Sequence, residues 1–415
     1  MLAPSSPSGP PTPDLGVQLC RSYDEHPRFR SAQPPWVVDT EVLDAFDDAI
    51  AFVRARPGTL TGAQFTDWSD RCRVSLSAIF DFLSDQARDP LEQRFVAELH
   101  AECRRLLDEN LALYARPRSG RGIALSDRLV QDRAMQLDRD AHFLAALPRP
   151  VVEEILHIGA QDLDTFRRRA SLGQCTRNDL SVNAGPSVVQ IARRLNTAFD
   201  ALGILDAVGG YMGRRTIVGG VALELSVPQA QWWANSFDDL VRAPATLYAH
   251  VDESIAFPKA IVYLSDVGPR NGPTSCYPQA FESLHLRPLQ EMVGRVIANV
   301  GNSEQSPLKA HYAKAYHQSM SSEPFRRHFM RLPRELRFNS HFGWDVLPDS
   351  AVEHALIARE QVVSGTAGSF IVFDGAKLLH RGGMVEDGER IALQVVFAPS
   401  TISTRLASTL RAARA

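Results

Sequence analysis

The periodicity of the apolar residues changes once along this chain, near Gly209 and Gly210. Before this point apolar residues recur at steps of three and four, a spacing that predicts amphipathic helices. Beyond it, short runs rich in β-branched and aromatic residues alternate with turn residues, which predicts strands. These runs lie at residues 215–226, 246–250, 260–265, 369–373 and 390–397. A helical first half followed by a β-rich second half predicts an α+β protein.

Three parts follow from this change of pattern. Residues 1–36 are rich in proline, which removes backbone donors, so we expect a disordered arm. Residues 37–205 should form a helical N-terminal region. Its last helices are expected at residues 126–146, 149–171 and 187–206. Residues 206–405 should form a β-rich domain with a mixed, partly helical insertion at about 281–350.

The composition is that of an ordinary soluble globular protein, with 44% hydrophobic and 22% charged residues. A formal net charge of -3 gives no electrostatic reason to expect nucleic acid or an anionic membrane as a partner. No run of about 18 apolar residues and no basic-then-apolar leader is present, so neither a membrane segment nor a secretory signal is expected. Five scattered cysteines in no CxxC pair favour reduced thiols in a cytoplasmic protein.

A histidine and an aspartate lie two positions apart in one strand-like segment. The chain reads YAHVD there, and alternate residues of a strand point to one face, so Tyr248, His250 and Asp252 share a side. One imidazole and one carboxylate on the same face can bind two adjacent positions of a metal ion. We therefore take His250 and Asp252 as candidate metal ligands.

A second histidine, His380, ends another β-rich run and is followed by Gly382 and Gly383. Such glycines permit close backbone approach beside a crowded centre. Taken alone, His380 is more typical of a core histidine at a strand end. It becomes a candidate third ligand only in combination with the residues that follow it.

Ten residues after His380, Arg390 begins the next predicted strand. A turn at residues 387–388 should bring this strand back beside His380. Alternation places Arg390, Ala392 and Gln394 on one face and larger apolar residues on the other. An arginine on the face that holds a metal ligand needs an anionic partner. Its planar guanidinium suits a carboxylate, which it can bind through two parallel hydrogen bonds.

Two histidines and one carboxylate leave three open positions on an octahedral iron, the ligand set of non-haem Fe(II) oxygenases. 2-Oxoglutarate can fill two of these positions through its keto-acid end while its distal carboxylate reaches Arg390, and O2 can take the third. Its oxidative decarboxylation to succinate and CO2 then drives oxidation of a substrate C–H bond. Tyr248 and Gln394 are expected to face the same interior, where they contact the co-substrate or substrate or simply line the core.

Two segments resemble the phytanoyl-CoA dioxygenase-like family of Fe(II)- and 2-oxoglutarate-dependent oxygenases. They are HVDESIAFPKAIVYLSDVGPRNGPTS at residues 250–275 and GSFIVFDGAKLLHRGGMVEDGERIALQVVF at residues 368–397. The resemblance covers roughly residues 210–400. It implies a double-stranded β-helix (jelly-roll, cupin-like) core with flanking helices, one Fe(II) and 2-oxoglutarate as co-substrate.

Two positions depart from the family's pattern. Family members often carry Pro-Gly-Ser-His after the turn at Asn271, where this chain reads NGPTSCYPQ, so the substrate mouth is expected to differ. A hydroxyl residue two positions after the arginine often helps hold the distal carboxylate, but here that residue is Ala392. Another group must then do so. Asp252 is present, so the halogenase variant, which has a small residue at that position, is not expected.

Two other functions remain open. A metal-dependent enzyme of the cupin type would keep the three ligands but would have no use for Arg390. A non-catalytic barrel would bind a small acid or a partner and would turn over no 2-oxoglutarate. For the oxygenase, a small-molecule substrate is the default, and hydroxylation, desaturation, ring formation or epimerisation would all fit.

Overall fold

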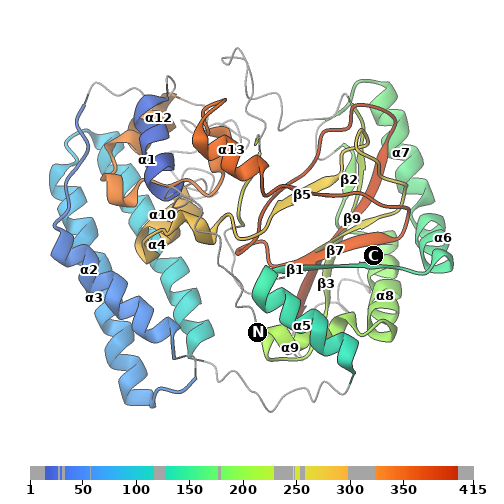
Figure 1. The fold of residues 1–415 in the computed structure, drawn as a ribbon, viewed down its shortest axis with the longest axis horizontal. Helices are drawn as coiled ribbons and strands as arrows, with labels where there is room; N and C mark the ends of the chain where they lie inside the picture. The colour runs from blue at the N-terminus through green and yellow to red at the C-terminus, as the bar shows by residue number, and fades with distance from the viewer. Residues whose placement is uncertain are drawn as a thin grey trace, which may run out of the picture.

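Two halves lie side by side in the protein, one built of helices and the other of β-sheets with helices around them (Figure 1). The structure is a computed structural model that describes residues 15–26, 29, 33–56, 58–115, 127–175, 179–228, 246, 248–252, 258–297 and 323–400. The helical half contains α1 (Leu15–Glu25), α2 (Thr40–Arg54), α3 (Gly62–Gln86), α4 (Pro90–Tyr114), α10 (Pro288–Ile297), α12 (Glu323–Arg331) and α13 (Ala351–Ile357), with the 3-10 helices η3 (Glu282–Leu284), η4 (Arg334–Leu336) and η5 (Phe342–Trp344). The β half contains α5 (Arg128–Asp140), α6 (Arg149–Ile158), α7 (Ala160–Ser171), α8 (Pro186–Ala201) and α9 (Ile204–Met212), with β1 (His142–Ala146), β2 (Ser181–Val182), β3 (Thr216–Ser226), β4 (Lys259–Tyr263), β5 (Thr274–Tyr277), β6 (Gln361–Val363), β7 (Ser369–Phe373), β8 (Leu379–Arg381) and β9 (Arg390–Pro399).

The helical half begins where the sequence supplies caps and apolar stripes. Asp39 accepts a hydrogen bond from the Glu41 N–H at 2.9 Å at the start of α2, and Thr61 forms a capping box with Gln64 at the start of α3. The stripe that α2 buries consists of Leu43, Phe46, Ala49, Ile50 and Val53. It shares one core with apolar residues of α10, α12 and α13, which come from the other end of the chain. No helix that the structure describes is long and apolar enough to cross a membrane.

The β half consists of two facing antiparallel sheets. The large sheet has six strands in the order β1-β7-β4-β9-β3-β2, and the small sheet has three in the order β6-β5-β8. Helices α5–α9 bury one face of the large sheet in a common core. The small sheet packs against the other face, where the Tyr263 hydroxyl donates to the Val363 carbonyl and accepts from the Thr274 N–H, each at 2.8 Å. The space between the sheets is where the candidate site lies.

The expected disordered arm is wrong from Leu15 onward, because α1 is a packed helix. Its residues Leu15, Leu19 and Tyr23 are buried at steps of four in the core of the helical half. Asp24, next along the helix, binds the buried guanidinium of Arg337 at 2.7 Å. The prolines flank the helix instead of interrupting it. Residues 1–14 lie outside the described part of the chain.

The expected helix at residues 126–146 is also wrong in its second part. Helix α5 ends at Asp140. The next residue, Ala141, has a left-handed φ of 59°, and the chain then enters β1. Strand β1 pairs with β7, more than two hundred residues away in the sequence, and this tertiary pairing overrides the helical preference of its alanines. The expected helices 149–171 and 187–206 are each two shorter helices, separated near Gly159 and Gly203.

The helical N-terminal region does not form one body. Helices α2–α4 pack with α10, whereas α6–α9 lie on the large sheet. The helical half therefore includes elements from the stretch between β5 and β6, where an insertion was expected. This matters for function, because α10 reaches from the helical half to the candidate site.

The thiols provide a test of this packing. All five cysteines are free, and Cys72, Cys103 and Cys276 are buried. Burial raises the pKa of Cys72 to about 11 and that of Cys276 to about 12. We expect a thiol reagent such as DTNB at about pH 8 to modify only Cys20 and Cys175 in the native protein, and all five after denaturation. Rapid native modification of more than two thiols, counted by absorbance, would contradict the packing of α3, α4 and the small sheet.

Candidate metal centre

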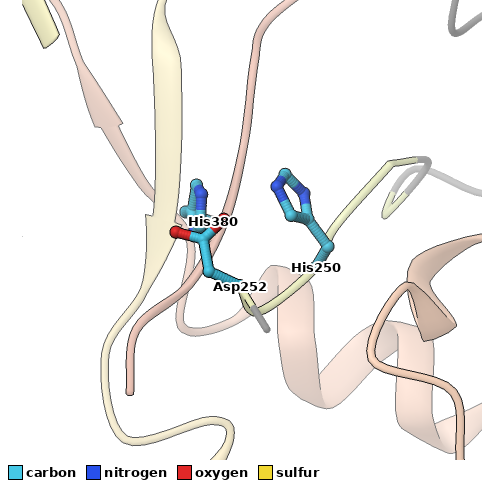
Figure 2. A group of neighbouring side chains, drawn as sticks. All are labelled: His250, Asp252 and His380. Carbon is cyan, nitrogen blue, oxygen red and sulfur yellow. The ribbon is translucent and has the colours of Figure 1, made fainter. Parts of the chain in front are cut away.

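Three side chains converge in a cavity of about 160 Å³ between the two sheets. The ligand atoms of His250, Asp252 and His380 all lie within 4.8 Å of one another, and Figure 2 shows the three neighbouring side chains. The cavity is also lined by Tyr248, Arg390 and other residues of the facing sheets. The structure thus brings together the three residues that the sequence marked as ligands.

Backbone pairing holds the ligands together. The His250 N–H donates to the His380 carbonyl at 2.9 Å, and the His380 N–H donates to the His250 carbonyl at 3.0 Å. The Asp252 N–H donates to the Gly375 carbonyl at 2.8 Å. Because all three bonds are made by the main chain, the positions of the ligands depend on the fold of their segments and only secondarily on their side chains.

Each histidine is oriented by a carbonyl two residues before it. Nδ1 of His250 lies 2.9 Å from the Tyr248 carbonyl, and Nδ1 of His380 lies 2.9 Å from the Leu378 carbonyl. These carbonyls can only accept, so Nδ1 carries the proton and Nε2 keeps a free lone pair. This is the arrangement by which proteins fix a metal-binding imidazole.

At neutral pH the site offers two neutral imidazoles and one carboxylate. Burial lowers the pKa of His250 to about 3, with a further contribution from His380. Burial also lowers the pKa of His380, against the opposing effect of Asp252. Burial by itself would raise the pKa of Asp252, but Lys259 and the two imidazoles hold that pKa below its usual value. This donor set suits a divalent transition metal.

Lys259 is a site residue that the sequence did not reveal. Its Nζ lies 2.7 Å from Oδ2 of Asp252, and it lines the same cavity. The one available signal was a lone charge that opens the apolar run KAIVY, on the face shared by Ile261. The ammonium orients the carboxylate through one oxygen and leaves the other oxygen to a metal.

Arg390 points into the cavity from the first position of β9. Its guanidinium donates to the Gly272 carbonyl and, at 3.1 Å, to the Ser226 hydroxyl. Its Nε is buried and has no hydrogen-bond partner in the described residues. No carboxylate of those residues lies within ion-pair distance. Burial lowers the pKa of Arg390, against the opposing effects of Tyr263 and of Glu224, which lines the same cavity. Such a site favours an anion from outside the chain.

The remaining expected residues also line the cavity. Tyr248 adopts a left-handed φ of 65°, and its ring centroid lies 4.7 Å from that of His250. Gln394 shares the inner face of β9 with Arg390, while Leu393 and Val395 belong to the core under α8. Arg381, which adjoins His380 in the chain, forms an ion pair with Glu360 at 2.8 Å.

The chain matches no family model and no curated protein. Among solved structures it is similar to the epimerase SnoN in complex with Fe3+, alpha ketoglutarate and nogalamycin RO, at 14% identity and a TM-score of 0.35, over 66% of this chain and 84% of that one. It is also similar to EctD from S. alaskensis with bound Fe, at 14% identity and a TM-score of 0.38, over 68% and 82% of the two chains. A third is the non-heme monooxygenase ThoJ, at 15% identity and a TM-score of 0.35, over 65% and 80%. Similarity at this level assigns neither a fold nor an activity to this chain. A function has to be inferred from the residues of the site.

Gly375 provides a test of the metal centre. An added Cβ there would meet Oδ2 of Asp252 at 1.7 Å, so Gly375→Ala should displace the carboxylate. We expect it to weaken Co(II) binding about 10- to 100-fold, the usual effect of disturbing groups that support metal ligands. The control is Gly382→Ala, because nothing lies within 4 Å of an added Cβ at that position. Equal affinity of the two variants in isothermal titration would contradict the assignment.

The lowered histidine pKa values predict how metal-free protein responds to acid. The unfolded chain binds a proton at His250 near the ordinary pKa of about 6.5, whereas the folded chain does so only near a pKa of about 3. Stability from this difference is complete above about pH 6.5 and is lost as the pH falls, by at most about 1.4 kcal/mol per unit for each histidine. His380 acts in the same direction.

We therefore expect urea unfolding midpoints of metal-free protein to fall between about pH 7 and 5. The double variant His250→Asn/His380→Asn serves as the control and should show a shallower fall. An identical pH dependence of the two proteins would mean that these histidines are not buried in the neutral form.

Proposed function

We propose that this protein is an Fe(II)- and 2-oxoglutarate-dependent oxygenase with a jelly-roll core, which oxidises a C–H bond of a small molecule. The observation that carries the proposal is one cavity that is lined both by the His-Asp-His group and by Arg390, whose Nε is buried and which forms no ion pair with a described carboxylate. The phytanoyl-CoA dioxygenase-like family, expected from the sequence, is consistent with the same residues.

The metal would be held by His250, Asp252 and His380. Both free Nε2 atoms and one carboxylate oxygen converge, and the set leaves open coordination positions for small ligands. Bound there, Fe(II) with 2-oxoglutarate and O2 supplies the oxidising power for C–H chemistry, with succinate and CO2 as co-products. The chain's own contribution is to fix the ligands, exclude water and place the substrate.

The distal carboxylate of 2-oxoglutarate would be held by Arg390. The unpartnered Nε and the adjacent amino group form the edge at which a carboxylate binds in two parallel hydrogen bonds. Ser226 is directly opposite Arg390 in the pairing of β3 with β9, and its hydroxyl lies 3.1 Å from that amino group. We assign Ser226 as the hydroxyl that replaces the one missing at Ala392.

Arg390 separates this function from the alternatives. A metal enzyme of the cupin type that does not use 2-oxoglutarate has no use for a buried guanidinium beyond its ligands. A non-catalytic barrel would bind a small acid without turnover. The substrate of the proposed oxygenase is small, because the cavity between the sheets has a volume of only about 160 Å³.

Arg390→Leu tests the proposal directly. Loss of a buried charged contact costs about 2–5 kcal/mol, so the apparent KM for 2-oxoglutarate should rise roughly 30- to several-thousand-fold. Fe(II) binding should stay nearly intact, because Arg390 contacts none of the three ligands. The measurement is succinate formation across a range of 2-oxoglutarate concentrations. Arg390→Lys is the charge-conserving control, and its KM for 2-oxoglutarate should lie between those of wild type and Arg390→Leu.

The possible results distinguish the functions. If the KM for 2-oxoglutarate is unchanged in Arg390→Leu, Arg390 does not bind the co-substrate, and the metal centre belongs to the cupin-type alternative. Wild-type protein that binds Fe(II) and 2-oxoglutarate but releases no succinate in the presence of any metabolite pool supports the binding barrel. Screening such pools for O2-dependent succinate release also identifies the substrate.

A further inference from the structure

We propose that Arg295 is a positioning residue for the metal centre, through which helix α10 of the helical half fixes the backbone that carries Asp252. The inference rests on the proposed function insofar as it assumes a metal at His250, Asp252 and His380. It concerns a residue on an element that contributes no ligand.

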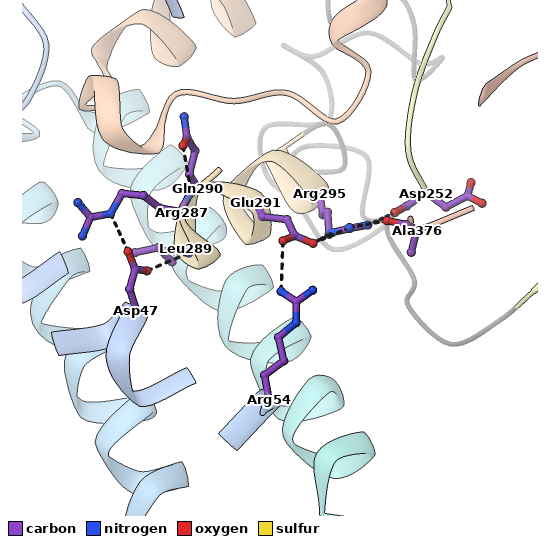
Figure 3. Close-up of polar contacts among 9 residues, drawn as sticks. All are labelled: Asp47, Arg54, Asp252, Arg287, Leu289, Gln290, Glu291, Arg295 and Ala376. Carbon is purple, nitrogen blue, oxygen red and sulfur yellow. Dashed lines mark hydrogen bonds and ion pairs between the residues drawn. The ribbon is translucent and has the colours of Figure 1, made fainter. Parts of the chain in front are cut away.

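The guanidinium of Arg295 bridges two backbone segments of the site. One amino group donates to the Asp252 carbonyl at 2.6 Å, and the other donates to the Ala376 carbonyl at 2.6 Å (Figure 3). The first segment carries a ligand, and the second follows Gly375, which accepts from the Asp252 N–H. Asp252 is therefore held at its N–H by one loop and at its carbonyl by Arg295.

The surroundings make these bonds strong. The Arg295 side chain is only 4% exposed, so water does not compete for the two carbonyls. Hydrogen bonds from a charged donor are about twice as strong as neutral ones, and a planar guanidinium holds both acceptors in a fixed relation. A lysine at this position would keep the charge but could not span both carbonyls in the same geometry.

Glu291, one turn earlier on α10, fixes the guanidinium in turn. Its Oε1 accepts from Nε of Arg295 at 3.1 Å and from an amino group at 2.6 Å. Burial would raise the pKa of Glu291, but Arg295 and Arg54 outweigh it and hold that pKa below its usual value. Arg54 of α2 approaches the other carboxylate oxygen at 3.6 Å from a largely exposed position.

A second contact joins α10 to the same ligand segment. The Gly294 carbonyl, next to Arg295, accepts from the Ser340 N–H at 2.9 Å. The Ser340 carbonyl accepts in turn from the N–H of Val251, which lies between His250 and Asp252, at 3.0 Å. Helix α10 thus contacts the ligand segment through a side chain and through a backbone relay, so its placement bears on the position of Asp252.

The same helix offers an internal comparison. Arg287, just before α10, forms ion pairs with Asp44 and Asp47 of α2. Figure 3 shows its pair with Asp47, which lies away from Asp252. An arginine that only docks α10 would behave like Arg287: its loss would lower thermal stability and leave metal affinity alone. Arg295 is expected to alter metal affinity beyond any change in stability.

The experiment compares Co(II) binding and the Co(II) absorption spectrum of full-length variants, with thermal unfolding measured on each. We expect Arg295→Lys to bind Co(II) about 10- to 100-fold more weakly than wild type, with an altered visible spectrum. Glu291→Gln leaves Arg295 in place but less firmly held, so its Co(II) affinity should lie between those of wild type and Arg295→Lys. The double variant Arg295→Met/Glu291→Gln avoids a buried unpaired carboxylate and should match or exceed the loss. Arg54→Met and Arg287→Met should bind Co(II) like wild type.

The outcomes separate this inference from the function on which it rests. Wild-type protein that binds no Co(II) overturns the metal centre, and this inference with it. Wild-type binding together with unchanged affinity and spectrum in Arg295→Lys overturns only the role of Arg295. The same follows if Arg287→Met weakens binding as much as Arg295→Lys does, because the effect would then be one of helix docking. If the double variant does not fold, Arg295→Lys and Glu291→Gln decide the matter by the same criteria.

Discussion

The reciprocal backbone pairing of His250 with His380 is the constraint on which the functional part of the structure depends. It joins two segments that are far apart in the sequence, one before β4 and the other at β8. Each histidine also turns its Nδ1 to a carbonyl of its own segment, so main-chain geometry decides where both Nε2 atoms point. A site built this way is pre-organised: burial removes water and keeps the imidazoles neutral, and an incoming metal need not reorganise its ligands.

The segment of residues 248–252 is not the strand that was expected, since only His250 forms an isolated bridge and Tyr248 has a left-handed φ, so alternation does not explain how His250 and Asp252 come together. Local alternation was enough to predict the inner face of β9, because the two-residue period of a strand does not depend on its partners. It placed Arg390 and Gln394 on the inner face before any pairing was known. Properties that arise from pairing could not be read this way. Ser226 matters because register sets it opposite Arg390, and Lys259 matters because β4 lies beside the ligand segment. Likewise β1 is a strand only through a partner far along the chain, and α1 was hidden by the prolines around it.

The helices around the β half contribute in two ways. Helices α5–α9 bury the outer face of the large sheet, and the inner face of that sheet lines the cavity. Helix α10 instead approaches the site from the helical half, and its only charged group aimed at the sheets is the buried Arg295. The sequence pattern does not distinguish the helices that cover the sheet from the helix that contacts the site, since α10 and α5–α9 all contain apolar residues at helical spacing. The distinction depends on a single arginine whose acceptors are backbone carbonyls, which leave no trace in side-chain chemistry.

Because Gly375 has no Cβ, the residues that can stand at position 375 depend on the residue at position 252. Any side chain there would occupy the place of the Asp252 carboxylate, so while the aspartate is kept in its position, every other amino acid at 375 must displace it. If the aspartate were exchanged for alanine or glycine, that volume would open and the constraint on 375 would disappear. The effect of a substitution at 375 therefore depends on the residue at 252. A descendant that lost the carboxylate could accumulate bulk at 375, and restoring the aspartate alone would then no longer rebuild the metal centre.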